Sequence, residues 1–222
     1  MNGLRIGFII AYLALLCLYF FSETTDNFKR RAVNKILLAS LFEFCALFLC
    51  FSAEGPYGIR LLLLAGLTFA FIGDIVLLWS FSGGGMFFGC ANLLLFSYEV
   101  ALAVRYSIPF VRLLPAAAVF IAFWGTLMQF FRKGIIRFGG IGVYPVYMGS
   151  VSLHGSLGIV LASVHPENGL LLLGIGSFLM MVADYFLTAY EFRHKKDWVL
   201  RCNSAAYFIG TMLSALSLSY SL

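Results

Sequence analysis

Residues 61–81 read LLLLAGLTFAFIGDIVLLWSF, an apolar run of membrane-spanning length that carries one carboxylate, Asp74, in its second half. Ionisable side chains are costly inside such runs, so a lone one indicates a functional site by default. A second run, residues 171–192, reads LLLGIGSFLMMVADYFLTAYEF and carries Asp184 at the same depth. The two segments together predict a membrane protein with a pair of intramembrane carboxylates.

The composition is that of an integral membrane protein. Of the 222 residues, 62% are hydrophobic and 11% are charged, and the mean hydropathy is +0.96. Soluble domains are about 45–50% apolar and about 25% charged. We therefore expect a single integral membrane domain over residues 1–222. The net charge of +5 comes from Lys and Arg in short loops beside apolar runs, which indicates membrane orientation and not nucleic-acid binding.

Eight apolar segments predict an all-α fold, a polytopic helical bundle with eight transmembrane helices. The first segment has Arg5 ahead of its apolar core, but no small-x-small cleavage site follows, so we interpret it as a helix and not as a signal peptide. The expected spans cover about residues 4–21, 34–52, 60–81, 86–105, 110–131, 141–163, 169–190 and 200–220.

The distribution of basic residues predicts the orientation. Eleven Lys and Arg residues lie in the loops after spans one, five and seven or at their edges, and four lie on the opposite side. By the positive-inside rule the first side is cytoplasmic and both termini face outward. We expect the plasma membrane of a bacterium as the location. The eleven residues are Lys29, Arg30, Arg31, Lys35, Arg132, Lys133, Arg137, Arg193, Lys195, Lys196 and Arg201; the four are Arg5, Arg60, Arg105 and Arg112.

The two Asp segments resemble each other. With a shift of 110 residues, Gly66 falls on Gly176 and Asp74 falls on Asp184. Span seven is the fourth span after span three, so a repeat would consist of two parallel four-helix halves related by an axis along the membrane normal. Outside spans three and seven the match is thin, and a chance similarity between two Leu-rich helices is an equal alternative.

The topology places both Asp residues in the cytoplasmic half of the membrane, and other polar residues are expected at the same level. They stand near the cytoplasmic ends of spans two, four, six and eight. On span seven, Ser177, Asp184 and Glu191 stand at i, i+7 and i+14, which puts them on one helix face toward the bundle interior. The other polar residues at this level are Lys35, Asn92, Tyr144, Tyr147, Asn203 and Tyr207.

Two carboxylates in a partly dry cavity can perform acid and base catalysis if one is protonated while the other is ionised. Lys35 could keep one Asp anionic or bind a phosphate at the membrane surface. Asn92, Tyr147 and Tyr207 could donate hydrogen bonds to developing charge. The same set of groups suits a lipid hydrolase and also a proton-coupled transporter or lipid carrier.

Each polar residue also has a structural interpretation. Either Asp could be tied to a Ser, Tyr or Lys of a neighbouring helix, and Lys35 could extend to the interface as an orientation charge. His154, near the middle of span six, is more typical of a helix-to-helix hydrogen-bond partner than of a catalyst. Glu43 and Glu99 are expected to pair with neighbouring basic or polar groups.

The sequence gives poor support for a metal site. His165 and His194 fall in loops on opposite sides, which leaves His154 as the intramembrane histidine, whereas catalytic zinc commonly takes three protein ligands rich in His. The five Cys residues show no CxxC spacing and lie in or beside apolar runs, so we interpret them as packing residues.

With these features the chain resembles the YhhN-type lysoplasmalogenase family of eight-helix membrane proteins. The resemblance extends over about residues 29–220, and the order and spacing of short segments carry it. These segments are FIGDIVLLW at residues 71–79, LLLGIGSFLMMVADYFLTAYEF at residues 171–192, Lys35 at the start of span two, YPVYM at residues 144–148, and residues 203–213 in span eight.

The resemblance implies hydrolysis of the vinyl ether bond of lysoplasmalogens, giving a fatty aldehyde and glycerophospho-ethanolamine or glycerophospho-choline. It implies a lysophospholipid substrate drawn from membrane lipid, and no metal or organic cofactor. Asp74 and Asp184 are then the expected catalytic residues, in acid and base roles that the sequence leaves unassigned. The expected substrate-binding residues are Lys35, Asn92, Tyr147, Asn203 and Tyr207.

The chain departs from the family pattern at three positions. Asn92 stands where a His commonly begins the span-four motif, Ile36 follows Lys35 where Pro is usual, and Ala183 precedes Asp184 where Ser is usual. The missing His removes a candidate proton shuttle. A different lipid substrate, reduced activity or no activity are the consequences to consider.

Overall fold

The structure is a computed structural model that describes residues 2–25, 27–52, 57–135, 144–193 and 195–220. In these ranges it contains eight α-helices and no β-strand. The helices are α1 (Asn2–Glu23), α2 (Phe28–Ser52), α3 (Tyr57–Leu77), α4 (Phe81–Arg105), α5 (Phe110–Arg132), α6 (Tyr144–Val164), α7 (Asn168–Phe192) and α8 (Asp197–Ser217).

The predicted all-α membrane fold is confirmed, because α1 to α7 are each long and apolar enough to cross a membrane. Such runs form helices because a backbone in lipid must satisfy its hydrogen bonds within the segment. Among the described residues, α8 does not reach the same apolarity, since it begins at Asp197 and also carries Arg201 and Asn203. The first predicted span is confirmed as a helix of the bundle.

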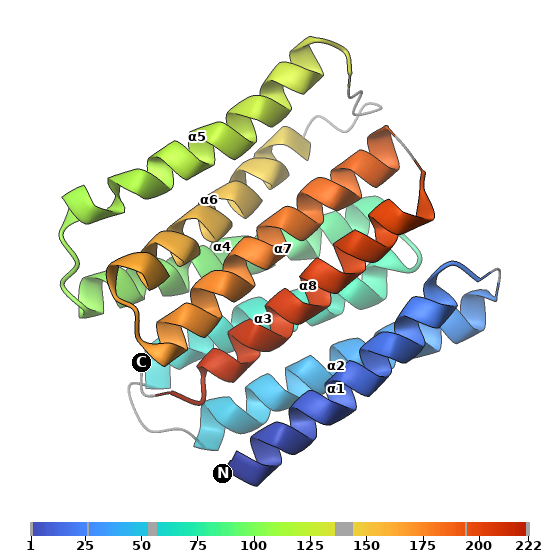
Figure 1. Ribbon diagram of the computed structural model, residues 1–222, viewed down its shortest axis with the longest axis horizontal. Helices are drawn as coiled ribbons and strands as arrows, with labels where there is room; N and C mark the ends of the chain where they lie inside the picture. The colour runs from blue at the N-terminus through green and yellow to red at the C-terminus, as the bar shows by residue number, and fades with distance from the viewer. Residues whose placement is uncertain (1, 26, 53–56, 136–143, 194, 221–222) are drawn as a thin grey trace.

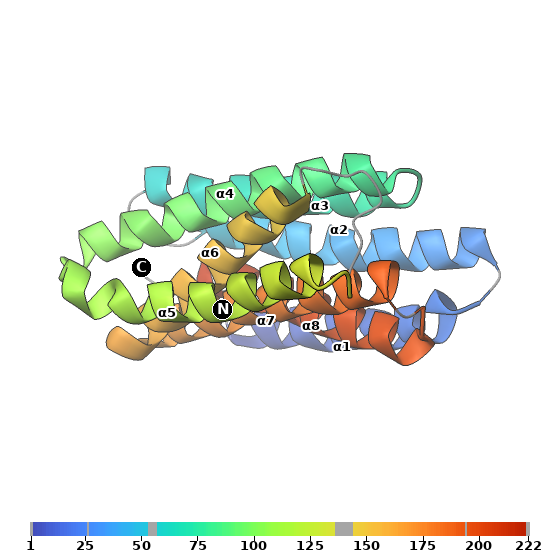
Figure 2. The ribbon, with the colours of Figure 1, turned by 90° about the horizontal axis from the view of Figure 1, so that it is seen from above.

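The helices form two layers, and helices next to each other in the sequence run in opposite directions. One layer contains α5, α6, α7, α8 and α1 side by side, and the other contains α4, α3 and α2 (Figures 1 and 2). Figure 2 shows that α6 is tilted, and it contacts α4 in the second layer as well as α5 and α7. The antiparallel order brings the ends of α1, α3 and α7 together with the beginnings of α2, α4 and α8.

Glycines set the closest helix contacts. On α7 and α8, a Cβ added to Gly176 would lie 2.7 Å from the Gly210 carbonyl oxygen, and one added to Gly210 would lie 2.7 Å from the Gly176 oxygen. Between α3 and α4, a Cβ on Gly66 would lie 2.7 Å from a Leu95 methyl group. Each Asp helix therefore packs closely against the helix that follows it. This agrees with the half-chain repeat, which stays a prediction.

The turn between α3 and α4 is short because Ser80 caps the N-terminus of α4. Its Oγ accepts a hydrogen bond from the Gly83 N–H at 3.1 Å. Gly84 lies inside α4 and directly over α3, where an added Cβ would be 2.9 Å from Cβ of Leu77. The cap and the close contact hold the end of α3, with Asp74, beside the first turns of α4.

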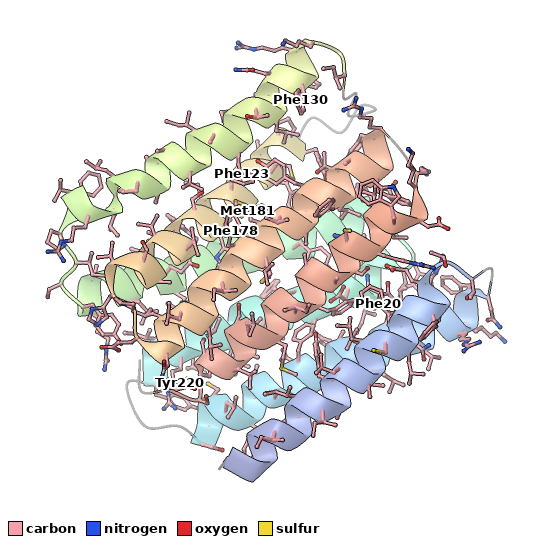
Figure 3. The ribbon with its side chains drawn as sticks, in the orientation of Figure 1. Phe20, Phe123, Phe130, Phe178, Met181 and Tyr220 are labelled. Atoms are coloured by element: carbon pink, nitrogen blue, oxygen red, sulfur yellow. The ribbon has the colours of Figure 1, made fainter. Side chains whose placement is uncertain are left out.

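Helix α5 lies at the edge of the bundle and packs mainly on α6 (Figure 1). Leu127 is its buried residue. The Phe123 ring of α5 also meets the Phe178 ring of α7 edge to face, with centroids 5.9 Å apart (Figure 3). A helix so exposed requires apolar surroundings, which is consistent with a membrane environment.

Candidate active site

A cavity of about 320 Å³ lies at the end of the bundle where α1, α3 and α7 end and α2, α4 and α8 begin. This end of the helices is toward the right of Figure 1. Its apolar wall is formed by Leu77, Leu78, Phe81, Phe88, Leu187, Leu200 and Phe208. Its polar wall is formed by Tyr19, Glu23, Arg31, Lys35, Asp74, Asp184, Tyr190, Glu191, Asn203, Ser204 and Tyr207. Polar and apolar groups thus converge from six helices.

Asp74 is 2% exposed, and both of its carboxylate oxygens have partners. Nζ of Lys35, from α2, lies 3.1 Å from Oδ1. The Tyr207 hydroxyl, from α8, donates to Oδ2 at 2.8 Å. Lys35 therefore points inward and not to the interface. Both oxygens of Asp74 thus face donors, an arrangement that favours the ionised form of the carboxyl group.

Asp184 lines the same cavity from α7 but has different surroundings. It is more exposed than Asp74, and Tyr147 of α6 is close enough to interact with its carboxylate. No ammonium group of the described residues forms an ion pair with it. The two carboxylates share a cavity, and Asp184 is the one that faces the open space without a fixed cation.

Two α8 residues make contacts beside the carboxylates. Asn203 lines the cavity, and its Nδ2 donates to the Ala183 carbonyl oxygen at 2.9 Å, directly before Asp184 in the chain. Tyr207 is held by its ring, which meets the Phe88 ring edge to face at 5.6 Å. These contacts fix α8 against α7 and α4, and they aim the Tyr207 hydroxyl at Asp74.

The structure brings together five of the seven residues predicted for the site: Lys35, Asp74, Asp184, Asn203 and Tyr207 all line the cavity. The other two do not line it. Tyr147 stands behind Asp184, between α6 and α4, with its ring 3.8 Å from a Cβ added at Gly89. Asn92 is 4% exposed on α4, deeper in the bundle than the cavity.

Glu23 lines the cavity, although it was not among the residues predicted for the site. Glu23 ends α1, is 2% exposed, and accepts a hydrogen bond from Ser204 of α8. The expected first span ended at residue 21, which left Glu23 in the loop. The four-residue spacing between Tyr19 and Glu23, which places both on one helix face, is the signal that could have found it.

A second polar cluster lies away from the cavity, where α4, α6 and α7 meet. Nδ1 of His154 is 3.0 Å from Oε1 of Glu99, and the Ser177 hydroxyl donates to the same oxygen at 2.8 Å. On the other side of the bundle the Thr68 hydroxyl donates to Glu43 at 2.7 Å. These contacts agree with the structural interpretation of His154, Glu43 and Glu99 as partners between helices.

Among the described residues, no group of three or more His, Cys, Asp and Glu side chains is arranged to hold a metal ion. Two of the cavity carboxylates already contact donors from the protein. Lys35 and Tyr207 donate to Asp74, and Ser204 donates to Glu23. This pattern is typical of acid–base chemistry and of recognition of a polar ligand.

The comparison with protein families gives one match. The model of the YhhN family matches residues 31–218, which is most of the chain and includes α2 from Arg31 onward and all of α3 to α8. No curated protein and no solved structure matched the chain. The matched segment contains both carboxylates, Asp74 and Asp184, and the whole of the cavity wall except the residues from α1.

Proposed function

The chain belongs to the YhhN family, and from this membership and the shared cavity we propose that it is a membrane lipid hydrolase that cleaves the vinyl ether bond of lysoplasmalogens. The products are a fatty aldehyde and a glycerophospho-alcohol. The observation that carries the proposal is that Asp74 and Asp184 line one cavity in unlike surroundings. Such a pair suits the cleavage of an enol ether, because one group gives a proton and the other stabilises the cation that forms.

The surroundings support a division of roles between the carboxylates. Asp74, which accepts from Lys35 and Tyr207, is the anion. Asp184, which faces the cavity, is the general acid. Asp184 gives its proton to the vinyl carbon remote from oxygen, the C=C electron pair forms the new C–H bond, and the ether oxygen shares the resulting positive charge. Asp74 stabilises this oxocarbenium ion.

Water completes the reaction. It adds to the oxocarbenium carbon, and its proton returns to Asp184, which is then a carboxylate and acts as a base. The hemiacetal collapses when its hydroxyl loses a proton and the glycerol oxygen gains one. The sum is one water consumed, one aldehyde and one alcohol released, and Asp184 restored to its protonated form. No metal or organic cofactor takes part in this scheme.

The proposal also includes a membrane topology. We infer that α8 crosses the membrane as an eighth span, because it lies along α7 over its length (Figure 1) and is joined to it through Gly176 and Gly210. The basic loops lie at the cavity end, so the cavity faces the cytoplasm and both termini face outward in the plasma membrane of a bacterium. The substrate then enters from the cytoplasmic leaflet.

A proton-coupled transporter or lipid carrier is the alternative that the carboxylates would also suit. A carrier needs a path that opens to each side of the membrane in turn. Beyond the cavity, the bundle is filled by large side chains that are less than 2% exposed, including Leu95, Tyr98 and Leu173. This dense packing supports a one-sided cavity and therefore the hydrolase.

The test is to incubate the purified protein with a lysoplasmalogen and, in parallel, with the matched ester lysolipid, and to assay free aldehyde. We expect aldehyde from the vinyl ether substrate and strong loss of release in Asp74→Asn and Asp184→Asn. Glu43→Gln, which changes a buried carboxylate outside the cavity, is the matched control. Aldehyde release that persists in both Asp variants would overturn the two-carboxylate mechanism, and no release by the wild type would favour the carrier.

A further inference from the structure

The carboxylate of Glu23 takes no part in the proposed reaction. The residue is 2% exposed and lines the cavity from the end of α1. Its Oε1 accepts from Ser204, and the Tyr19 hydroxyl lies close enough to interact with the carboxylate, but Oε2 has no partner in hydrogen-bonding geometry among the described residues. An unsatisfied buried carboxylate oxygen costs free energy, and a donor supplied by a ligand would remove that cost.

The charges around the cavity favour a cationic ligand group. Four carboxyl groups line it, from Glu23, Asp74, Asp184 and Glu191; with Asp184 protonated as the proposed acid, three of them are anions, against two cationic side chains. Lys35 is committed to Asp74 at 3.1 Å. A ligand that brought only negative charge would add to this excess, whereas a positively charged group would reduce it.

Arg31 supplies the complementary half of a zwitterion site. It lies in the first turn of α2, lines the cavity, and remains partly exposed at the cavity opening. A guanidinium group beside a helix N-terminus favours a phosphate, because the N-terminal end of the helix dipole is also positive. Arg31 and Glu23 thus offer one group for a phosphate and one for an ammonium within the same cavity.

We propose that Glu23 binds the ammonium of the lysolipid headgroup and selects ethanolamine over choline. The unpaired oxygen is an acceptor and requires an N–H donor. A primary ammonium has three such donors, and a trimethylammonium has none. The inference rests on the proposed function, because it assigns a headgroup to the same cavity, with the phosphate placed on Arg31 and the vinyl ether toward Asp184.

The test compares lysolipids with an inert alkyl ether chain, which lack the vinyl group and cannot be cleaved. Native mass spectrometry of the protein in detergent micelles measures how much of each one binds. The series runs from ethanolamine through N-methyl and N,N-dimethyl ethanolamine to choline. We expect affinity to fall at each step, with about a tenfold preference for ethanolamine over choline, as a hydrogen bond between charged groups provides. Equal affinities along the series would overturn the proposal.

Glu23→Gln tests whether the preference for ethanolamine depends on Glu23. This isosteric change removes the charge, and we expect ethanolamine binding to weaken by more than choline binding, until the two headgroups bind about equally. Glu191→Gln makes the same change of charge in the same cavity and is expected to keep the preference. Equal loss of both headgroups in Glu23→Gln would indicate a merely structural role. The methylation series needs only the wild type, so the proposal stays testable if the variant does not fold.

Two further measurements distinguish binding of a lipid headgroup from binding of a soluble compound, and headgroup binding from catalysis. Free phosphoethanolamine is expected to compete poorly with the ethanolamine lysolipid, and strong competition would indicate a site for the soluble compound and overturn the lipid assignment. Aldehyde release from a lysoplasmalogen is measured separately. Headgroup preference without aldehyde release keeps this inference and contradicts the hydrolase, whereas aldehyde release without headgroup preference does the opposite.

Discussion

Nζ of Lys35 lies 3.1 Å from Oδ1 of Asp74, although the two residues stand on different helices and both are at least nine-tenths buried. The pair joins the beginning of α2 to the end of α3 at the inner wall of the cavity. Removal of one partner from a buried ion pair leaves an uncompensated charge. The resulting loss in the free energy of unfolding is much larger than the net contribution of the intact pair.

Lys35→Met is therefore expected to lower the free energy of unfolding by about 3 kcal/mol and to abolish aldehyde release. Thermal unfolding of the purified protein in detergent measures the first effect. The double variant Lys35→Met with Asp74→Asn removes both charges and should recover most of the stability while staying inactive. If Lys35→Met were as stable as the wild type, the ion pair would not contribute to the stability of the protein.

Tyr207→Phe tests the second donor to Asp74. The change keeps the ring that meets Phe88 and removes the hydroxyl that lies 2.8 Å from Oδ2. We expect kcat to fall about tenfold, as for loss of a hydrogen bond to a charged group, with little change in the melting temperature. Tyr185→Phe removes a hydroxyl bonded to Ser152 outside the cavity and serves as the control. Equal kcat in Tyr207→Phe and Tyr185→Phe would contradict the role of Tyr207.

Asp184→Asn tests which of the two carboxyl groups gives the proton and which is the anion. The variant cannot give a proton, so kcat should fall by about a hundredfold or more, while the amide keeps the volume and the fold. Asp74→Asn should lose activity and also stability, because Lys35 is left without its counter-charge. Circular dichroism melts alongside the aldehyde assay measure both. An Asp184→Asn protein that loses stability but keeps kcat would reverse the assignment.

Glu99→Gln tests the polar cluster of α4, α6 and α7. Because it weakens the contact to His154 but does not reach the cavity, we expect a loss of about 1 kcal/mol in the free energy of unfolding, typical of polar contacts inside membrane bundles. A double-mutant cycle with His154→Ala gives the coupling between the two side chains. Loss of aldehyde release in a stably folded Glu99→Gln protein would show that the cluster takes part in the reaction.

Gly176→Ala tests the contact between α7 and α8. The added methyl would lie 2.7 Å from the Gly210 carbonyl oxygen, so the helices must separate, at a cost of about 1–3 kcal/mol. Gly85→Ala is the matched control, because a Cβ at Gly85 meets nothing within 4 Å and alanine favours the helix. If Gly176→Ala were as stable as Gly85→Ala, the close contact between α7 and α8 would not contribute to the stability of the bundle.

The level of the candidate site was predictable from the sequence because helix length and direction fix the depth of each residue. Asp74, Asp184 and Lys35 line one cavity for that reason. Rotation about the helix axis is set by packing between helices, which depth alone does not give. This explains why Asn92 and Tyr147, at about the right level, stand outside the cavity wall.

The ends of the helices were harder to predict. Glu23 belongs to the last turn of α1, two residues beyond the expected span, and that difference decides whether its carboxylate faces a loop or the cavity. The polar side chains of α8, among them Arg201 and Asn203, lower its apolarity below that of the other seven helices. The local sequence therefore shows less clearly than the packing that α8 belongs to the bundle.

The contact between Gly176 and Gly210 also bears on motion. Because the two glycine backbones approach each other closely, sliding of α7 against α8 would cause a clash, so we expect the two helices to move together. Asp184 on one helix and Tyr207 on the other would then keep their separation. We expect the cavity to widen for a substrate through displacement of α1 and α2, which carry Glu23, Arg31 and Lys35 and pack less extensively on α8 than α7 does.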